Sequence, residues 1–137
     1  MRVMEINWPD SLAELGEFLK TQGLSFQRRG IVPHTHDILW QYGNDRIAVR
    51  VIADRGDVWS AQVADIAGWP QEWYDATELR ELITGSTEDG QSVSEKMRII
   101  KDNWLAIVQS FAEQNREKTH SRLKKIRAEW AKREFGN

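Results

Sequence analysis

The sequence has no cysteine, and its apolar runs are only a few residues long. The lack of cysteine excludes a disulfide framework, a thiolate zinc site and a cysteine nucleophile. The short apolar runs offer no membrane-spanning helix, and residues 1–6 lack the apolar stretch of a secretory signal peptide. We therefore expect a cytoplasmic protein that has no contact with a membrane.

Familiar catalytic motifs are missing as well. The sequence contains no Gly-x-Ser-x-Gly elbow, no phosphate-binding glycine-rich loop and no His-Glu-x-x-His helix. His34 and His36 would face the same way in an extended segment, but a third metal ligand would have to be Asp37 or the distant His120. The sequence thus favours a non-enzymatic protein with no metal and no cofactor. A metal-dependent enzyme at His34 and His36 stays the weaker alternative.

What the 137 residues do contain is enough apolar surface, with seven tryptophans, for one folded domain. Ser11 and Glu14 form a capping-box pattern, apolar residues follow at spacings of three and four, and Gly23 provides a helix end. This pattern predicts a helix over residues 11–22. The segment 24–32 is either a strand with a bulge or a turn.

Three apolar runs separated by turn residues predict an antiparallel meander. The runs cover residues 38–42, 46–53 and 58–64. In the middle run Ile47, Val49 and Val51 share one face while Arg50 points the other way. One face of the sheet is therefore expected to be core.

Capping patterns and helical periodicity predict the remaining elements. A box at Asp75 and Glu78 starts a short helix over residues 76–84. A second cap at Ser92 starts a long helix whose apolar stripe continues to Phe111. The expected fold is α+β, with an N-terminal helix, a three- to four-stranded antiparallel meander sheet, a short helix, and a long C-terminal helix packed on one sheet face.

The charge changes after Asn115. Residues 116–134 carry eight basic and three acidic residues, a net charge of +5, which leaves −7 for the remainder. We therefore divide the chain into a single domain at 1–115 and a basic helical extension at 116–137. One helix over 92–134 would be ~64 Å long, against a diameter of roughly 35–40 Å for a compact chain of this length. The extension must protrude, break near Asn115 or meet a partner.

The extension has two possible roles. Its apolar residues Leu123, Ile126 and Trp130 need cover from the body or from a second copy, and we expect them to form a homodimer or partner contact. Its basic side chains are an alternative site for nucleic acid. The acidic body and a pI near 5.9 make nucleic acid the less favoured partner.

Aromatic residues gather between the sheet and the short helix. Trp69 and Trp73 flank a proline, and Tyr74 follows directly. Loop aromatics can anchor a partner protein, and Arg55 at a hairpin tip can contact a carboxylate. We expect Trp69, Trp73, Tyr74 and Arg55 to bind a protein partner, and the acidic body favours a basic one such as a nuclease.

One resemblance rests on the run from Val49 through Asp-Arg-Gly to Trp59, then Trp73-Tyr74-Asp75 before a short leucine-rich helix, and a long helix that ends at Phe111. Over residues 49–111 the chain resembles small bacterial α+β proteins, among them immunity proteins of polymorphic-toxin systems. The resemblance implies a cytoplasmic, non-enzymatic protein that inhibits a toxin by occluding it.

Overall fold

The structure, a computed structural model, describes residues 8–32, 35, 37–54, 58–67, 72–88 and 91–135. Arg55, His34, His36 and Trp69 lie outside these residues, so their expected roles stay predictions. In the part of the chain that is described, no helix is long and apolar enough to cross a membrane.

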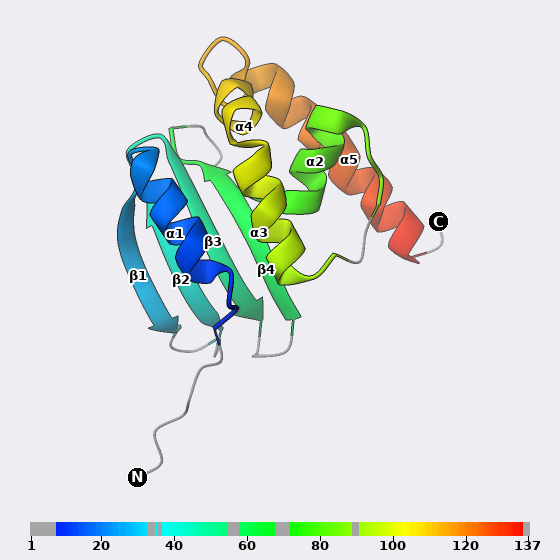
Figure 1. The fold of residues 1–137 in the computed structure, drawn as a ribbon. Coiled ribbons are helices and arrows are strands. Elements are labelled where there is room, and N and C mark those ends of the chain that lie inside the picture. Colours follow the sequence, from blue (N-terminus) through cyan, green and yellow to red (C-terminus); the bar gives the residue numbers. More distant parts are fainter. Residues whose placement is uncertain are drawn as a thin grey trace.

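The expected α+β fold is confirmed. In chain order the elements are α1 (Leu12–Thr21), β1 (Ser25–Ile31), β2 (Ile38–Gly43), β3 (Ile47–Asp54), β4 (Val58–Asp65), β5 (Trp73–Asp75), α2 (Ala76–Thr84), α3 (Val93–Asp102), α4 (Trp104–Ser110) and α5 (Arg116–Phe135). The strands pair antiparallel in that same order. Helices α1 and α3 lie side by side over one face of the sheet, and α2, α4 and α5 group beside α3 (Figure 1).

The sheet has five strands, one more than the upper number expected. The uncertain segment forms β1, which pairs with β2 and has a register shift between Phe26 and Arg28, so the strand with a bulge is the reading that holds. The fifth strand, β5, occupies part of the expected aromatic loop. Three residues are too few to show the alternation of a strand, so only pairing with β4 reveals it.

Of two predicted helix starts, the one at Asp75 has the expected cap and the one at Ser11 does not. Asp75 and Glu78 form the expected capping box at α2, which spans the residues predicted for it. The Ser11 hydroxyl makes no cap, because Ser11 has helical dihedral angles (φ −78°, ψ −2°), whereas a capping side chain needs an extended backbone. The hydroxyl donates instead to Ser94 Oγ at 3.0 Å and ties α1 to α3.

The helix expected from Ser92 to Phe111 is interrupted at Asn103, whose side-chain amide donates to Ile99 O at 2.9 Å, so it forms α3 and α4. A second break lies near Asn115, one of the three outcomes expected. α4 ends at Ser110, and the side-chain Nδ2 of Asn115 donates to Gln109 O at 2.9 Å. The Thr119 hydroxyl then donates to Ser110 O at 2.6 Å. These side-chain bonds stabilise a turn that contains neither proline nor glycine, and α5 contacts α2 after it.

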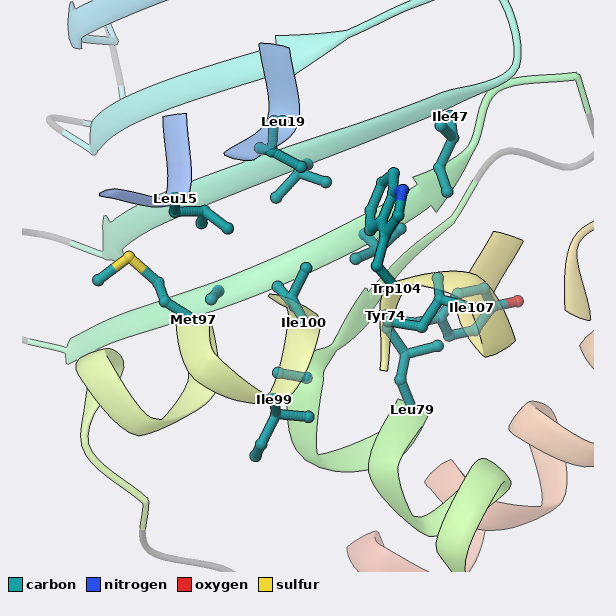
Figure 2. Packing of buried hydrophobic residues seen from close by; sticks show 14 of the residues in the cluster. Leu15, Leu19, Ile47, Tyr74, Leu79, Met97, Ile99, Ile100, Trp104 and Ile107 are labelled. Atoms are coloured by element: carbon teal, nitrogen blue, oxygen red, sulfur yellow. The ribbon is translucent and has the colours of Figure 1, made fainter. Parts of the chain in front are cut away.

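The core lies between the sheet and the helices. Val49 and Val51 of β3 pair with Val63 and Ala61 of β4, and all four are fully buried, which confirms the predicted core face. The helices add the buried residues Leu15, Leu19, Met97, Ile100, Trp104 and Ile107 (Figure 2). The opposite face of the sheet carries no described helix, because α1 and α3 both pack on this one.

Candidate functional site

The short strand β5 sends its two aromatic side chains to opposite sides of the sheet. Tyr74 pairs with Val63 and is 2% exposed, whereas Trp73 pairs with Ala64 and is only partly buried. Because neighbouring residues of a strand alternate in direction, both cannot serve one surface. Trp73 remains a residue that a partner can contact. Tyr74 does not, which corrects the expectation that it belongs to a protein-binding loop.

Tyr74 is the first member of a polar network that joins β4, β5 and α5. Its hydroxyl lies 2.6 Å from His120 Nδ1, and His120 Nε2 lies 3.1 Å from Asp65 Oδ2. Arg116 Nε donates to the same Asp65 oxygen at 2.7 Å. The Asp65 side chain is 1% exposed, and its other oxygen has no hydrogen-bond partner among the described residues.

The network assigns the proton of the imidazole. A carboxylate only accepts, so His120 Nε2 donates to Asp65, and His120 Nδ1 shares a hydrogen bond with the Tyr74 hydroxyl. Burial, with a smaller contribution from Glu72, raises the pKa of Tyr74 to about 12, so the phenol stays neutral at physiological pH. Both ring nitrogens are occupied and the phenol is protonated. The arrangement joins α5 to β4 and β5.

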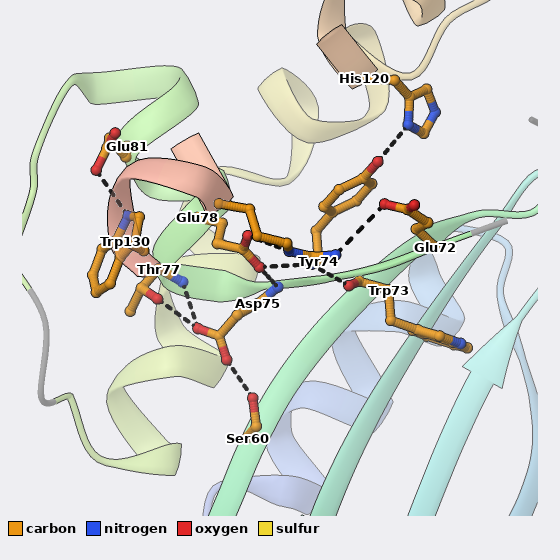
Figure 3. Close-up of polar contacts among 11 residues, drawn as sticks. Ser60, Glu72, Trp73, Tyr74, Asp75, Thr77, Glu78, Glu81, His120 and Trp130 are labelled. Carbon is orange, nitrogen blue, oxygen red and sulfur yellow. Dashed lines mark hydrogen bonds and ion pairs between the residues drawn. The ribbon is translucent and has the colours of Figure 1, made fainter. Parts of the chain in front are cut away.

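A second network binds the middle of α5 to the start of α2 (Figure 3). Arg127 donates from Nε to Glu78 Oε2 and from Nη2 to Glu78 Oε1, each at 2.9 Å, and also from Nη2 to the Trp73 carbonyl oxygen at 2.7 Å. The hydrogen bond to Glu78 raises the pKa of Arg127. Glu78 also accepts the Asp75 backbone amide of the capping box. One carboxylate therefore caps α2 and holds α5.

The apolar face of α5 is turned inward as well. Leu123 and Ile126 are 0% and 7% exposed and belong to the core cluster, and Trp130 packs against it. The Trp130 indole donates to Glu81 Oε1 at 3.0 Å. These three residues were expected to form a homodimer or partner contact. Leu123 and Ile126 are instead covered by their own chain, and Trp130 is partly covered, because the turn before α5 returns the helix to α2.

Ion pairs between the basic α5 and acidic residues of the body also hold the helix in place. Arg116, Arg127 and Arg133 of α5 form ion pairs with Asp65, Glu78 and Glu81. Five further basic residues of α5 have no ion pair within the described part of the chain: Lys118, Arg122, Lys124, Lys125 and Lys132. The basic charge that a nucleic-acid site would need is thus partly neutralised by the body.

A groove of about 890 Å³ runs along α5 beside the first network. Tyr74 and His120 line it, together with the small side chains of Ser121, Ala128 and Ala131. Its charged residues have both signs: Glu72, Glu113, Glu117, Arg116, Lys124 and Arg127. The charged side chains that line the groove are therefore balanced, three of each sign.

The face of the sheet opposite the helices carries one partly exposed aromatic side chain of β5, Trp73. The Arg50 guanidinium lies over the Trp73 ring, 4.2 Å from its centroid, and Arg50 Nε donates to Gln62 Oε1 at 2.7 Å. Gln41 donates to Gln27 on the neighbouring strands at 2.6 Å. Burial lowers the pKa of Arg50, although an arginine remains charged at physiological pH. A fixed cation and indole thus stand together on this face.

The metal hypothesis gains no support from the rest of the site. Among the described residues, no three His, Cys, Asp or Glu side chains lie where they could hold one ion. His34 and His36 are not among those residues, so that hypothesis stays untested. Protein-family models, curated proteins and solved structures contain no match to this chain.

Sequence reasoning missed the network around Asp65. It gave Asp65 no functional role and considered His120 only as a distant metal ligand. One signal was present, because Arg116 and His120 are four residues apart and lie on one face of a helix. The sequence did not show which carboxylate meets them.

Proposed function

We propose that this protein is a non-enzymatic protein-binding module, an immunity-type inhibitor that occludes a toxin. The observation that carries the proposal is the stacked Trp73–Arg50 pair on the face of the sheet opposite the helices. Tryptophan and arginine are the side chains most enriched among residues that dominate binding energy in protein interfaces. Stacking and the hydrogen bond to Gln62 hold the pair in place, which lowers the entropy lost on binding.

The dimensions of this face support a protein partner. Four strands spaced about 4.8 Å apart and about seven residues long, at about 3.3 Å per residue, give a face of roughly 19 by 23 Å. That is about half of the ~800 Å² that each partner contributes to a standard interface. The face is large enough for the centre of such an interface, and the neighbouring loops would supply its rim.

The non-enzymatic part of the proposal is supported by the sequence, which contains no Gly-x-Ser-x-Gly elbow, no phosphate-binding glycine-rich loop and no His-Glu-x-x-His helix. A cytoplasmic location belongs to the same proposal, since a chain without cysteine needs no oxidising compartment to fold.

The test asks whether the protein binds the product of the adjacent gene and protects cells against that product. Purified protein is titrated with that product by calorimetry, and the two are co-expressed in a growth assay. Trp73→Ala should weaken binding at least tenfold and abolish protection, because truncation of a central anchor costs about 2 kcal/mol or more. Trp73→Phe should retain part of the affinity, since a ring still stacks under Arg50.

Lys125→Ala is the matched control, because Lys125 is exposed on α5 and has no ion pair with a described residue. It should bind and protect like the unaltered protein. Thermal melts of all variants show whether each remains folded. Absence of binding, or a Trp73→Ala variant with unchanged affinity, would contradict the proposal.

A further inference from the structure

Helix α4 presents large apolar side chains on the side away from the core. Trp104 and Ile107 are 4% and 0% exposed, whereas Leu105 and Val108 are 75% and 41% exposed. Leu105 and Val108 are three residues apart, so they are neighbours on one helix face. A single exposed leucine is ordinary, but a pair beside a cavity extends the apolar surface of that cavity outward.

That cavity has a volume of about 250 Å³. The buried side chains of Leu24, Ile47, Trp104 and Phe111 line it, and Figure 2 shows Ile47 and Trp104 among the core residues. The volume is below the ~300–1,000 Å³ of sites that enclose a whole small-molecule ligand. It is suited to a single large side chain.

The charged residues that line the cavity are all positive, and its other polar residues, Gln22 and Asn44, are neutral. Arg46 and Arg116 line it, and no carboxylate does. The Arg46 side chain has no ion pair or hydrogen bond within the described part of the chain. Its backbone is nevertheless fixed, since its amide donates to Asn44 Oδ1 and its carbonyl accepts the amide of Ile66, both at 2.8 Å.

The second arginine is only partly occupied. Arg116 donates through Nε to Asp65, and its two terminal nitrogens have no bond to a described residue. A guanidinium offers five N–H groups in a fixed plane, so Arg116 can hold Asp65 and still bind a second carboxylate. The cavity thus combines an apolar floor with two cationic groups that lack full partners.

We propose that this cavity is a docking site for an acidic peptide segment of a partner protein. One leucine, phenylalanine or tryptophan side chain of the segment fills the cavity, and neighbouring carboxylates bind Arg46 and Arg116. A peptide is the occupant because Leu105 and Val108 lie at the cavity and would stay exposed beside a small acid, whereas a peptide covers them. The site lies on the helix-covered side of the sheet and does not depend on Trp73.

The probe is a fluorescein-labelled heptapeptide with leucine at its centre and three acidic residues on each side, measured by fluorescence polarisation. Companion peptides replace the central leucine by alanine or all acidic residues by lysine. We expect the alanine peptide to bind at least tenfold more weakly and the lysine peptide not to bind. Affinity for the leucine peptide should fall as salt rises, because the carboxylate contacts are screened.

The protein variants separate the two parts of the site. Leu105→Ser and Arg46→Ala should each weaken binding at least fivefold, and neither residue is buried, so both variants should fold. Arg122→Ala is the matched control, since this exposed arginine does not line the cavity. Trp73→Ala should also leave peptide binding unchanged, which separates this site from the proposed function.

Several results would overturn the proposal. Equal binding of the leucine and alanine peptides would mean attraction by charge alone, and unchanged affinity of Leu105→Ser or Arg46→Ala would place the peptide elsewhere. Failure of the folded protein to bind the leucine peptide would remove the site. Sedimentation that shows a homodimer dissociated by Leu105→Ser would assign this surface to a second copy instead.

Discussion

Replacement of Leu123 by alanine tests whether α5 is part of the cooperatively folded unit. Leu123 is fully buried and lies in the same apolar cluster as residues of the sheet and of α1. If α5 were an independent extension, a cavity in it would affect only the last helix. If it belongs to the core, the same cavity must destabilise the whole molecule.

The size of the effect follows from the atoms removed. Leucine to alanine deletes three carbon atoms, worth about 0.8 kcal/mol each in transfer from water. The cavity left behind adds to that loss, since a packed interior relaxes only in part. We expect a loss of about 3 kcal/mol in the free energy of unfolding. For a chain of this length that lowers Tm by roughly 10 °C.

The measurement is urea denaturation followed by both tryptophan fluorescence and far-ultraviolet circular dichroism. Fluorescence reports mainly on the body, while circular dichroism includes the twenty residues of α5. In Leu123→Ala both signals should shift together to lower urea with an unchanged slope. Lys125→Ala, on the same helix and exposed, should stay within about 0.5 kcal/mol of the unaltered protein.

The reasoning would be refuted by two separate transitions. An early loss of helical signal, with the fluorescence transition unmoved, would mean that residues 116–137 fold apart from 1–115. A variant as stable as Lys125→Ala would mean that Leu123 is not buried in solution.

Two further predictions concern titratable groups. Burial raises the pKa of Asp75, but Lys96 and the hydrogen-bond donors together lower it by more, so its pKa lies below the ordinary value. Its stabilising effect should hold above the unfolded pKa near 3.9 and be lost as pH falls through the lower folded value. Urea midpoints at several acidic pH values should therefore fall less steeply for Asp75→Asn, and equal slopes would refute this. Tyr74→Phe removes the bond to His120 and should cost about 1 kcal/mol in thermal unfolding. Burial raises the pKa of Tyr74 to about 12, so the ultraviolet titration of Tyr74→Phe should lack the phenolate that forms near pH 12. If the variant instead lacks a phenolate that forms near pH 10, burial does not raise this pKa.

The sequence predicted the site only in part, because strand pairing and the packing of α5 depend on residues far apart in the chain. Trp73 and Tyr74 are adjacent and were expected to act together, yet strand pairing sends one to each side of the sheet. Leu123 and Ile126 plainly needed cover, but an apolar stripe does not specify what provides it, because the hydrophobic effect has no direction. The turn before α5 contains no proline or glycine, and it depends on side-chain hydrogen bonds that no short motif marks.

The sequence by itself determined the local structure. Asp75 and Glu78 fix the start of α2, and the alternation of Val49 and Val51 fixes the core face of β3, since capping and strand periodicity act between residues only a few positions apart. Only the tertiary structure decided that Asp65 meets Arg116 and His120, which lie 51 and 55 positions away along the chain. A charge pattern states that such a pairing is favourable, while the packing of α5 determines which carboxylate lies within reach.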